Sequence, residues 1–138
     1  MSADPRPLDS ALEITAFVHP TCSKCRGLRA LLEERRVPVR WRPYLEQPPS
    51  VEELEGLLAA LGEEDPRVLV REKEDLYREL GLARADRRTL LEAIAAHPRL
   101  LVRPLVAAGE RAVLARPPER ALAFLEELGL LPASGAGA

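Results

Sequence analysis

The chain carries two cysteines, Cys22 and Cys25, three residues apart. A cysteine reacts as its thiolate, which forms where the surroundings favour negative charge. Cys22 comes directly before a predicted helix, whose first backbone N–H groups and dipole provide such surroundings. Lys24 and Arg26 add positive charge nearby. The spacing therefore predicts Cys22 as a nucleophile and Cys25 as a thiol able to attack a mixed disulfide formed on Cys22.

Two other interpretations of the cysteines have to be weighed. Free cysteines also pack as small hydrophobic residues that take part in no chemistry. A structural zinc site would need His19 and His97 as further ligands, and these do not follow zinc-finger spacing. A pair of this spacing after a strand and before a helix favours redox chemistry, so no metal or organic cofactor is expected.

Composition narrows the class of protein and of partner. The 138 residues are 46% hydrophobic and 30% charged, which predicts one globular domain. A net charge of −2 gives no reason to expect a nucleic-acid or membrane partner. No stretch approaches the roughly 18 apolar residues of a membrane span, and residues 1–9 lack the apolar segment of a signal peptide. We therefore expect a cytoplasmic protein, in which a structural disulfide is unusual.

The elements around the cysteines follow from hydrophobic spacing. Residues 14–18 form a short β-type run that ends at His19-Pro20, and apolar residues then recur at helical spacing from Leu28 to Leu32. Residues 39–45 read as a second strand. This strand–helix–strand unit predicts two parallel strands joined by a right-handed crossover.

The rest of the chain adds helices and then a hairpin. Ser50 and Glu53 form a capping box, and helical patterns continue in short pieces until His97-Pro98. Gly109-Glu110 separates two apolar runs, which indicates an antiparallel hairpin, and a last helix is predicted from Pro117-Pro118. The order β-α-β, helical insert at about 50–98, β-β-α predicts an α/β thioredoxin-like fold with a mixed sheet. One domain should span 12–130, with flexible tails at 1–11 and 132–138.

Five segments in register resemble the glutaredoxin-linked arsenate reductase family over roughly residues 12 to 130. They are His19-Pro20-Thr21-Cys22 with Arg26, Tyr44 to Ser50, Val70 to Lys73 with Tyr77 to Leu82, His97-Pro98 to Val106, and Leu114 to Pro117. The resemblance implies that Cys22 attacks arsenate, that glutathione then adds, and that arsenite leaves with the help of glutaredoxin.

The resemblance also implies an oxyanion site made by Arg71, Arg103 and Arg116. An arginine fork suits arsenate because it donates paired, charge-assisted hydrogen bonds to such oxyanions. The alternative is that these arginines are solvated surface residues, since 18 of the 20 basic residues are arginine. Pro104 matches the proline that faces the cysteine loop in this fold, usually after a cis peptide bond.

Two positions depart from the family pattern. His19 replaces the usual asparagine, so it either stabilises the thiolate and moves protons or is bonded to backbone at the strand end. Cys25 replaces the usual serine and is typical of the related Spx-type regulators, which bind RNA polymerase and use the pair as an oxidation switch. The Arg116-Pro117 motif and the Tyr44 to Ser50 segment favour a reductase over that regulator. Cys25 leaves the electron donor open between glutathione with glutaredoxin and thioredoxin, and a general thiol–disulfide oxidoreductase is a third reading.

Overall fold

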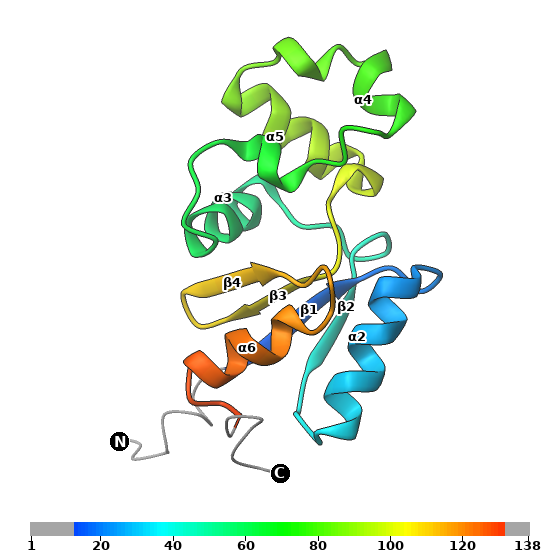
Figure 1. Ribbon diagram of the computed structural model, residues 1–138. Helices are drawn as coiled ribbons and strands as arrows, with labels where there is room; N and C mark the ends of the chain where they lie inside the picture. The colour runs from blue at the N-terminus through cyan, green and yellow to red at the C-terminus, as the bar shows by residue number, and fades with distance from the viewer. Residues whose placement is uncertain (1–12, 132–138) are drawn as a thin grey trace.

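The computed structural model describes residues 13–131, so the two expected tails lie outside the described residues. Its centre is a four-stranded mixed sheet in the order β2-β1-β3-β4 (Figure 1). The strands are β1 (Ile14–Val18), β2 (Arg40–Pro43), β3 (Leu105–Ala108) and β4 (Arg111–Leu114). β1 runs parallel to β2 and antiparallel to β3, and β3 and β4 form an antiparallel hairpin. The predicted α/β thioredoxin-like class and its mixed sheet are confirmed.

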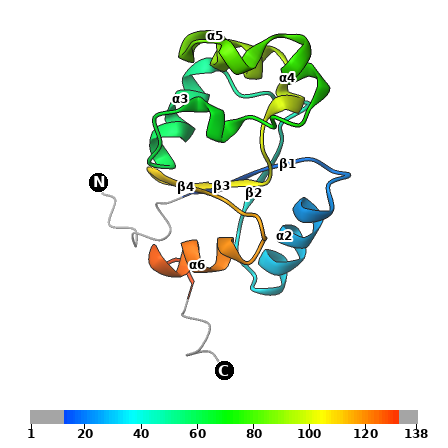
Figure 2. The ribbon, with the colours of Figure 1, turned by 45° about the horizontal axis from the view of Figure 1, so that its top comes forward.

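Helices cover both faces of the sheet, as Figure 2 shows with the sheet nearly edge-on. On one face lie α2 (Ser23–Glu34) and α6 (Arg120–Glu127). On the other lies the helical insert, made of α3 (Val51–Ala60), α4 (Asp75–Glu79), α5 (Arg87–Ala96) and the 3-10 segments η1 (Pro66–Leu69), η2 (Leu82–Arg84) and η3 (Pro98–Leu100). Within residues 13–131, no helix has the length and apolar character that a membrane crossing requires.

The sheet separates two hydrophobic cores because side chains alternate between its faces. Ala16 and Val106 point toward α2 and α6, whereas Phe17 and Leu105 point toward the insert. We call the first the lower core; its buried members include Ala16, Val18, Cys22, Cys25, Leu28, Leu32, Val106, Phe124 and Leu125. We call the second the insert core; its buried members include Phe17, Tyr44, Leu54, Leu58, Leu69, Leu90, Ile94, Leu100 and Leu105.

Two element boundaries differ from the sequence expectation, and proline explains both. β2 ends at Pro43 instead of continuing to Leu45, because the next residues turn back and the N–H groups of Glu46 and Gln47 bond to the Pro43 carbonyl. The last helix begins at Arg120 and not at Pro117, since Pro117 and Pro118 accept the hydrogen bonds of a preceding turn. The capping box of Ser50 and Glu53 at the start of α3 is confirmed.

Candidate active site around Cys22

Cys22 is the N-cap residue of α2, and the turn before it is tight. Its backbone N–H donates to the His19 carbonyl at 3.2 Å, and its own carbonyl accepts from Arg26 N at 3.0 Å. No side chain caps the helix, so the free backbone N–H groups of its first turn are available to the Cys22 sulfur. The residue is 9% exposed, which places the sulfur at the edge of the lower core and within reach of solvent.

The pKa of Cys22 is lowered from 9.0 to about 7. Burial alone raises it, but hydrogen bonds from the Cys25 N–H, the Arg103 side chain, the Cys25 thiol and the Lys24 N–H outweigh that effect. At neutral pH about half of the Cys22 molecules are therefore thiolate, against about 1% for a pKa of 9. Such a thiolate is a nucleophile under cellular conditions.

Cys25 lies in the opposite electrostatic situation. It is only 3% exposed, and its sulfur accepts a hydrogen bond from the backbone N–H of His19 at 3.3 Å. Burial, followed by the neighbouring Cys22 sulfur, raises the pKa of Cys25 to about 12. Cys25 is thus a protonated thiol that donates to Cys22, and the two cysteines have distinct chemical characters. Within residues 13–131, no group of three or more His, Cys, Asp or Glu side chains could hold a metal ion.

Arg103 approaches Cys22 from the segment that precedes β3. Its Nη1 donates to the Tyr44 hydroxyl at 3.4 Å, and its guanidinium lies close enough to the Cys22 sulfur to help lower the pKa of Cys22. Its Nε is buried and has no hydrogen-bond partner within the described part of the chain. The following Arg103–Pro104 peptide bond is cis, as the resemblance implied. Arg103 therefore combines a positive charge beside Cys22 with an N–H group that no described residue uses, which suits the binding of an anion.

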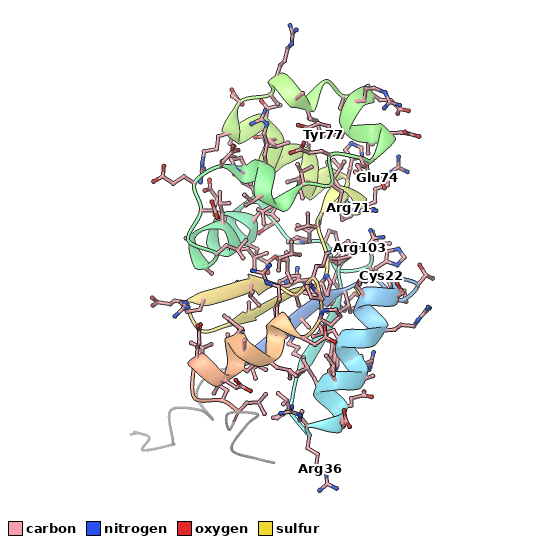
Figure 3. All side chains as sticks on the ribbon, viewed as in Figure 1. Cys22, Arg36, Arg71, Glu74, Tyr77 and Arg103 are labelled. Atoms are coloured by element: carbon pink, nitrogen blue, oxygen red, sulfur yellow. The ribbon has the colours of Figure 1, made fainter. Side chains whose placement is uncertain are left out.

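Arg71 reaches the same region from the insert. Its backbone N–H donates to the Leu100 carbonyl at 2.7 Å, which fixes the segment after η1. Its Nη1 lies 2.9 Å from Glu74 Oε2, and the other oxygen of Glu74 lies 3.4 Å from Arg99 Nε. In Figure 3 Arg71 and Arg103 lie between the insert and Cys22, with Glu74 next to Arg71. The positive charges of both arginines thus act on His19 and Tyr44 beside the cysteine loop, and the Glu74 carboxylate partly neutralises that of Arg71.

Arg116 and Arg26 occupy different places relative to the sulfur. Arg116 Nη1 donates to the backbone carbonyl of Arg103 at 3.1 Å, so it supports the backbone that carries Arg103. Arg26 is exposed on α2, and its backbone N–H bonds to the Cys22 carbonyl. Of the three predicted oxyanion arginines, the structure brings Arg71 and Arg103 toward the cysteine loop, and it places Arg116 against the Arg103 main chain.

His19 is bonded to backbone at the end of β1. Its Nδ1 accepts from Thr21 N at 3.1 Å and lies 2.9 Å from Thr21 Oγ1. Burial, followed by the positive charges of Arg103 and Arg71, lowers the pKa of His19. The ring is therefore neutral at pH 7 and Nε2 carries the proton, because Nδ1 is used as an acceptor. Of the two readings of His19, this geometry favours the backbone-bonded one.

Sequence reasoning assigned no role to Tyr44 and Glu74. Tyr44 is fully buried, accepts from Arg103 and meets the His19 ring edge-on, with 6.3 Å between the ring centroids. Burial raises the pKa of Tyr44, so its hydroxyl stays protonated. Its signal in the sequence was that one of only two tyrosines lies at the end of the predicted strand 39–45. Glu74 lies three residues after Arg71. This spacing brings the two side chains together only if the chain turns between them, and the sequence does not show that turn.

The site and fold can now be compared with known proteins. The model of the ArsC family matches residues 17–124, which span the end of β1, the cysteine loop, β2, the helical insert, the β3–β4 hairpin and most of α6. The chain belongs to the ArsC family. A Neisseria meningitidis protein named arsenate reductase is 44% identical to this ArsC chain over 115 residues, which cover 82% of the chain and 98% of the relative. The solved structure of arsenate reductase from Vibrio cholerae is 40% identical, covers 83% of this chain and 98% of its own, and superimposes with a TM-score of 0.79.

The regulator considered at the sequence level is also among the relatives of this ArsC protein. The global transcriptional regulator Spx of Enterococcus faecalis is 28% identical over 95 residues, which cover 67% of this chain and 71% of the regulator. Its identity and coverage are lower than those of the two arsenate reductases. The comparisons therefore favour the reductase branch over the regulator.

Proposed function

We propose that this ArsC-family protein reduces arsenate to arsenite, with Cys22 as the nucleophile. The observation that carries the proposal is the guanidinium of Arg103, which helps lower the pKa of Cys22 and whose Nε has no hydrogen-bond partner within residues 13–131. A thiolate next to a convergent arginine fork can bind an anionic tetrahedral substrate and attack it. The names of its relatives support arsenate as that substrate.

In the first step the Cys22 sulfur attacks arsenic(V) and displaces one oxygen, which leaves as hydroxide and is protonated to water. Negative charge moves from sulfur to the arsenate oxygens. Arg103 can stabilise it because its positive charge lies beside Cys22, and Arg71 can add to this from the side of His19. We propose that Arg116 contributes by holding the Arg103 backbone, and that Arg26 and the α2 N–H groups bias the loop toward the thiolate.

In the second step another thiol attacks the Cys22 sulfur. A sulfur–sulfur bond forms, the sulfur–arsenic bond breaks, and its electron pair reduces arsenic to the trivalent state, which leaves as arsenite. If glutathione supplies that thiol, glutaredoxin reduces the mixed disulfide. If Cys25 supplies it, the product is a Cys22–Cys25 disulfide, which a thioredoxin-type dithiol reduces. We propose that this chemistry serves arsenic detoxification in the cytoplasm, where such donors keep thiols reduced.

The test is arsenite production from arsenate by the purified protein, in parallel with glutathione plus glutaredoxin and with thioredoxin plus its reductase. We expect turnover with at least one donor system and none for Cys22→Ser. Cys25→Ser should keep activity with glutaredoxin and lose activity with thioredoxin, so it separates the two routes. Absence of turnover in a folded protein whose cysteines form a reversible disulfide would contradict the proposal and favour the Spx-like regulator, with RNA polymerase as its partner.

A further inference from the structure

Arg42 makes an unusual number of contacts for a residue of an edge strand. Nη1 and Nη2 lie 2.6 and 3.0 Å from the two carboxylate oxygens of Glu53. Nε and Nη2 also donate to the carbonyls of Gln47 and Pro48, at 2.9 and 3.1 Å. The guanidinium lies over the Phe17 ring, 5.2 Å from its centroid. None of these contacts is needed to pair β2 with β1, which uses backbone groups alone.

These contacts close the loop of residues 43–50 between β2 and α3. Arg42 is anchored at the end of β2, Gln47 and Pro48 lie in the middle of the loop, and Glu53 is in the first turn of α3. Glu53 also accepts from Ser50 N at 3.0 Å, which joins the clamp to the helix cap. Because the Arg42 side chain is only 15% exposed, its pair with Glu53 is better shielded than an ordinary surface ion pair.

The loop that Arg42 closes delivers Tyr44 to the active site. Tyr44 is the first residue after β2, and its N–H bonds to the Val18 carbonyl, at the end of the neighbouring strand. Its hydroxyl accepts from Arg103 Nη1 at 3.4 Å, and the Arg103 guanidinium in turn acts on the Cys22 sulfur. Arg42 is therefore linked to Arg103 and Cys22 through the backbone of the loop and through Tyr44.

We propose that Arg42 is a positioning residue of the active site, which locks the 43–50 loop so that Tyr44 holds Arg103 against Cys22. The proposal rests on the proposed function only in treating Cys22 as the reactive group. An arginine is required because one planar fork makes the bidentate carboxylate contact and still reaches two carbonyls, which a lysine cannot do. If Arg42 served folding alone, its loss would lower stability and leave the Cys22 sulfur unaffected.

The decisive variant is Arg42→Met, with Arg29→Met as the matched control. Arg29 also makes one ion pair, with Glu33 at 3.1 Å, and one ring contact, 4.9 Å from the Trp41 centroid, but on the α2 side of the sheet. The measurement is the rate of Cys22 alkylation by iodoacetamide against pH, with the modified residue identified by mass spectrometry. We expect Arg42→Met to raise the midpoint by about 0.5 to 1 pH unit and Arg29→Met to leave it unchanged. An unchanged midpoint in folded Arg42→Met would overturn the proposal, whatever its melting temperature.

A double-mutant cycle tests whether Arg42 acts through Tyr44. Tyr44→Phe should raise the same midpoint. Adding Arg42→Met should raise it little further, because the contact of the Tyr44 hydroxyl with Arg103, through which Arg42 acts, is already lost. Fully additive shifts would refute the route through Tyr44.

If Arg42→Met does not fold, Glu53→Gln replaces it. This variant weakens the contact with Arg42 but keeps an oxygen for Ser50 N, and an unchanged midpoint in it refutes the proposal. Alkylation needs no arsenate, so the result is independent of whether arsenate is the substrate.

Discussion

Replacing Arg103 by methionine tests the electrostatic basis of the site most directly. Methionine keeps an unbranched side chain that replaces the aliphatic part of arginine, so the segment before Pro104 retains its packing. The change removes the hydrogen bond from the guanidinium to the Cys22 sulfur and one positive charge beside it. The backbone N–H groups of Cys25 and Lys24 remain, and burial continues to raise the pKa of Cys22.

The size of the effect follows from the contacts of Cys22. With a pKa of about 7, Cys22 is about half thiolate at pH 7. The Arg103 hydrogen bond is the largest favourable contribution after that of the Cys25 N–H, so its loss should raise the pKa by about 1 unit. The thiolate fraction at pH 7 then falls to about one tenth, and alkylation slows about five-fold. Above pH 9 the variant and the natural protein should react at nearly the same rate.

The assay is iodoacetamide alkylation over about pH 5 to 10, with the ultraviolet absorbance of the thiolate as an independent measure. A midpoint that stays at about 7 in folded Arg103→Met would refute the reasoning, since the helix N–H groups alone would then stabilise the thiolate.

The pH dependence of stability provides a second check. Because the folded pKa lies below the unfolded one, Cys22 adds stability as pH rises from about 7 toward 9, and this gain is lost as pH falls through 7. Arg103→Met should shrink that gain.

Three further predictions concern the groups around the site and in the insert core. The hydrogen bond and charge of Arg42 lower the pKa of Glu53 to about 2. The contribution of Glu53 to stability is therefore complete above about pH 4.5 and is lost as pH falls through 2, and acid unfolding of Glu53→Gln should lack this contribution. Glu74→Gln removes the charge that partly neutralises Arg71, so the arsenate KM should fall about two- to five-fold in steady-state assays, and a higher KM would show that Glu74 mainly orients Arg71. Leu58→Ala in the insert core should lower the free energy of unfolding by about 2–5 kcal/mol in urea titrations, and a loss below about 1 kcal/mol would mean that the core closes over the cavity.

The parts of the fold set by local pattern could be predicted from the sequence. The strand at 14–18, the helix after Cys22, the capping box at Ser50 and the hairpin at Gly109 each depend on residues close together in the chain. The insert was predicted only as helical pieces, because its short 3-10 turns are defined by packing around Leu69 and Leu100, which neighbouring residues do not encode. The end of β2 and the start of α6 depend on which N–H groups the proline carbonyls accept hydrogen bonds from, and hydrophobic spacing does not reveal this.

The site divides in the same way. That Cys22 stands at a helix start is a local fact, so its character as a nucleophile could be predicted. The contact of Arg103 with Tyr44 joins residues 59 positions apart, and no periodicity predicts such a pair. For Arg116 the sequence showed the family motif, but only the structure shows that its guanidinium donates to the Arg103 carbonyl. His19 likewise needed coordinates, because both of its readings fit the same residue at the strand end.

The division of the hydrophobic interior by the sheet has an evolutionary consequence. The nucleophile is rooted in the lower core, whereas Tyr44 belongs to the insert core, and Arg71 follows directly on a member of that core, Val70. Substitutions on the insert side of the sheet can therefore change the groups that surround the thiolate, while the cysteine pair stays packed in the lower core. A scaffold partitioned in this way can change the surroundings of its cysteine pair without moving the pair itself. The relatives of this chain, which include arsenate reductases and a transcriptional regulator, are consistent with that history.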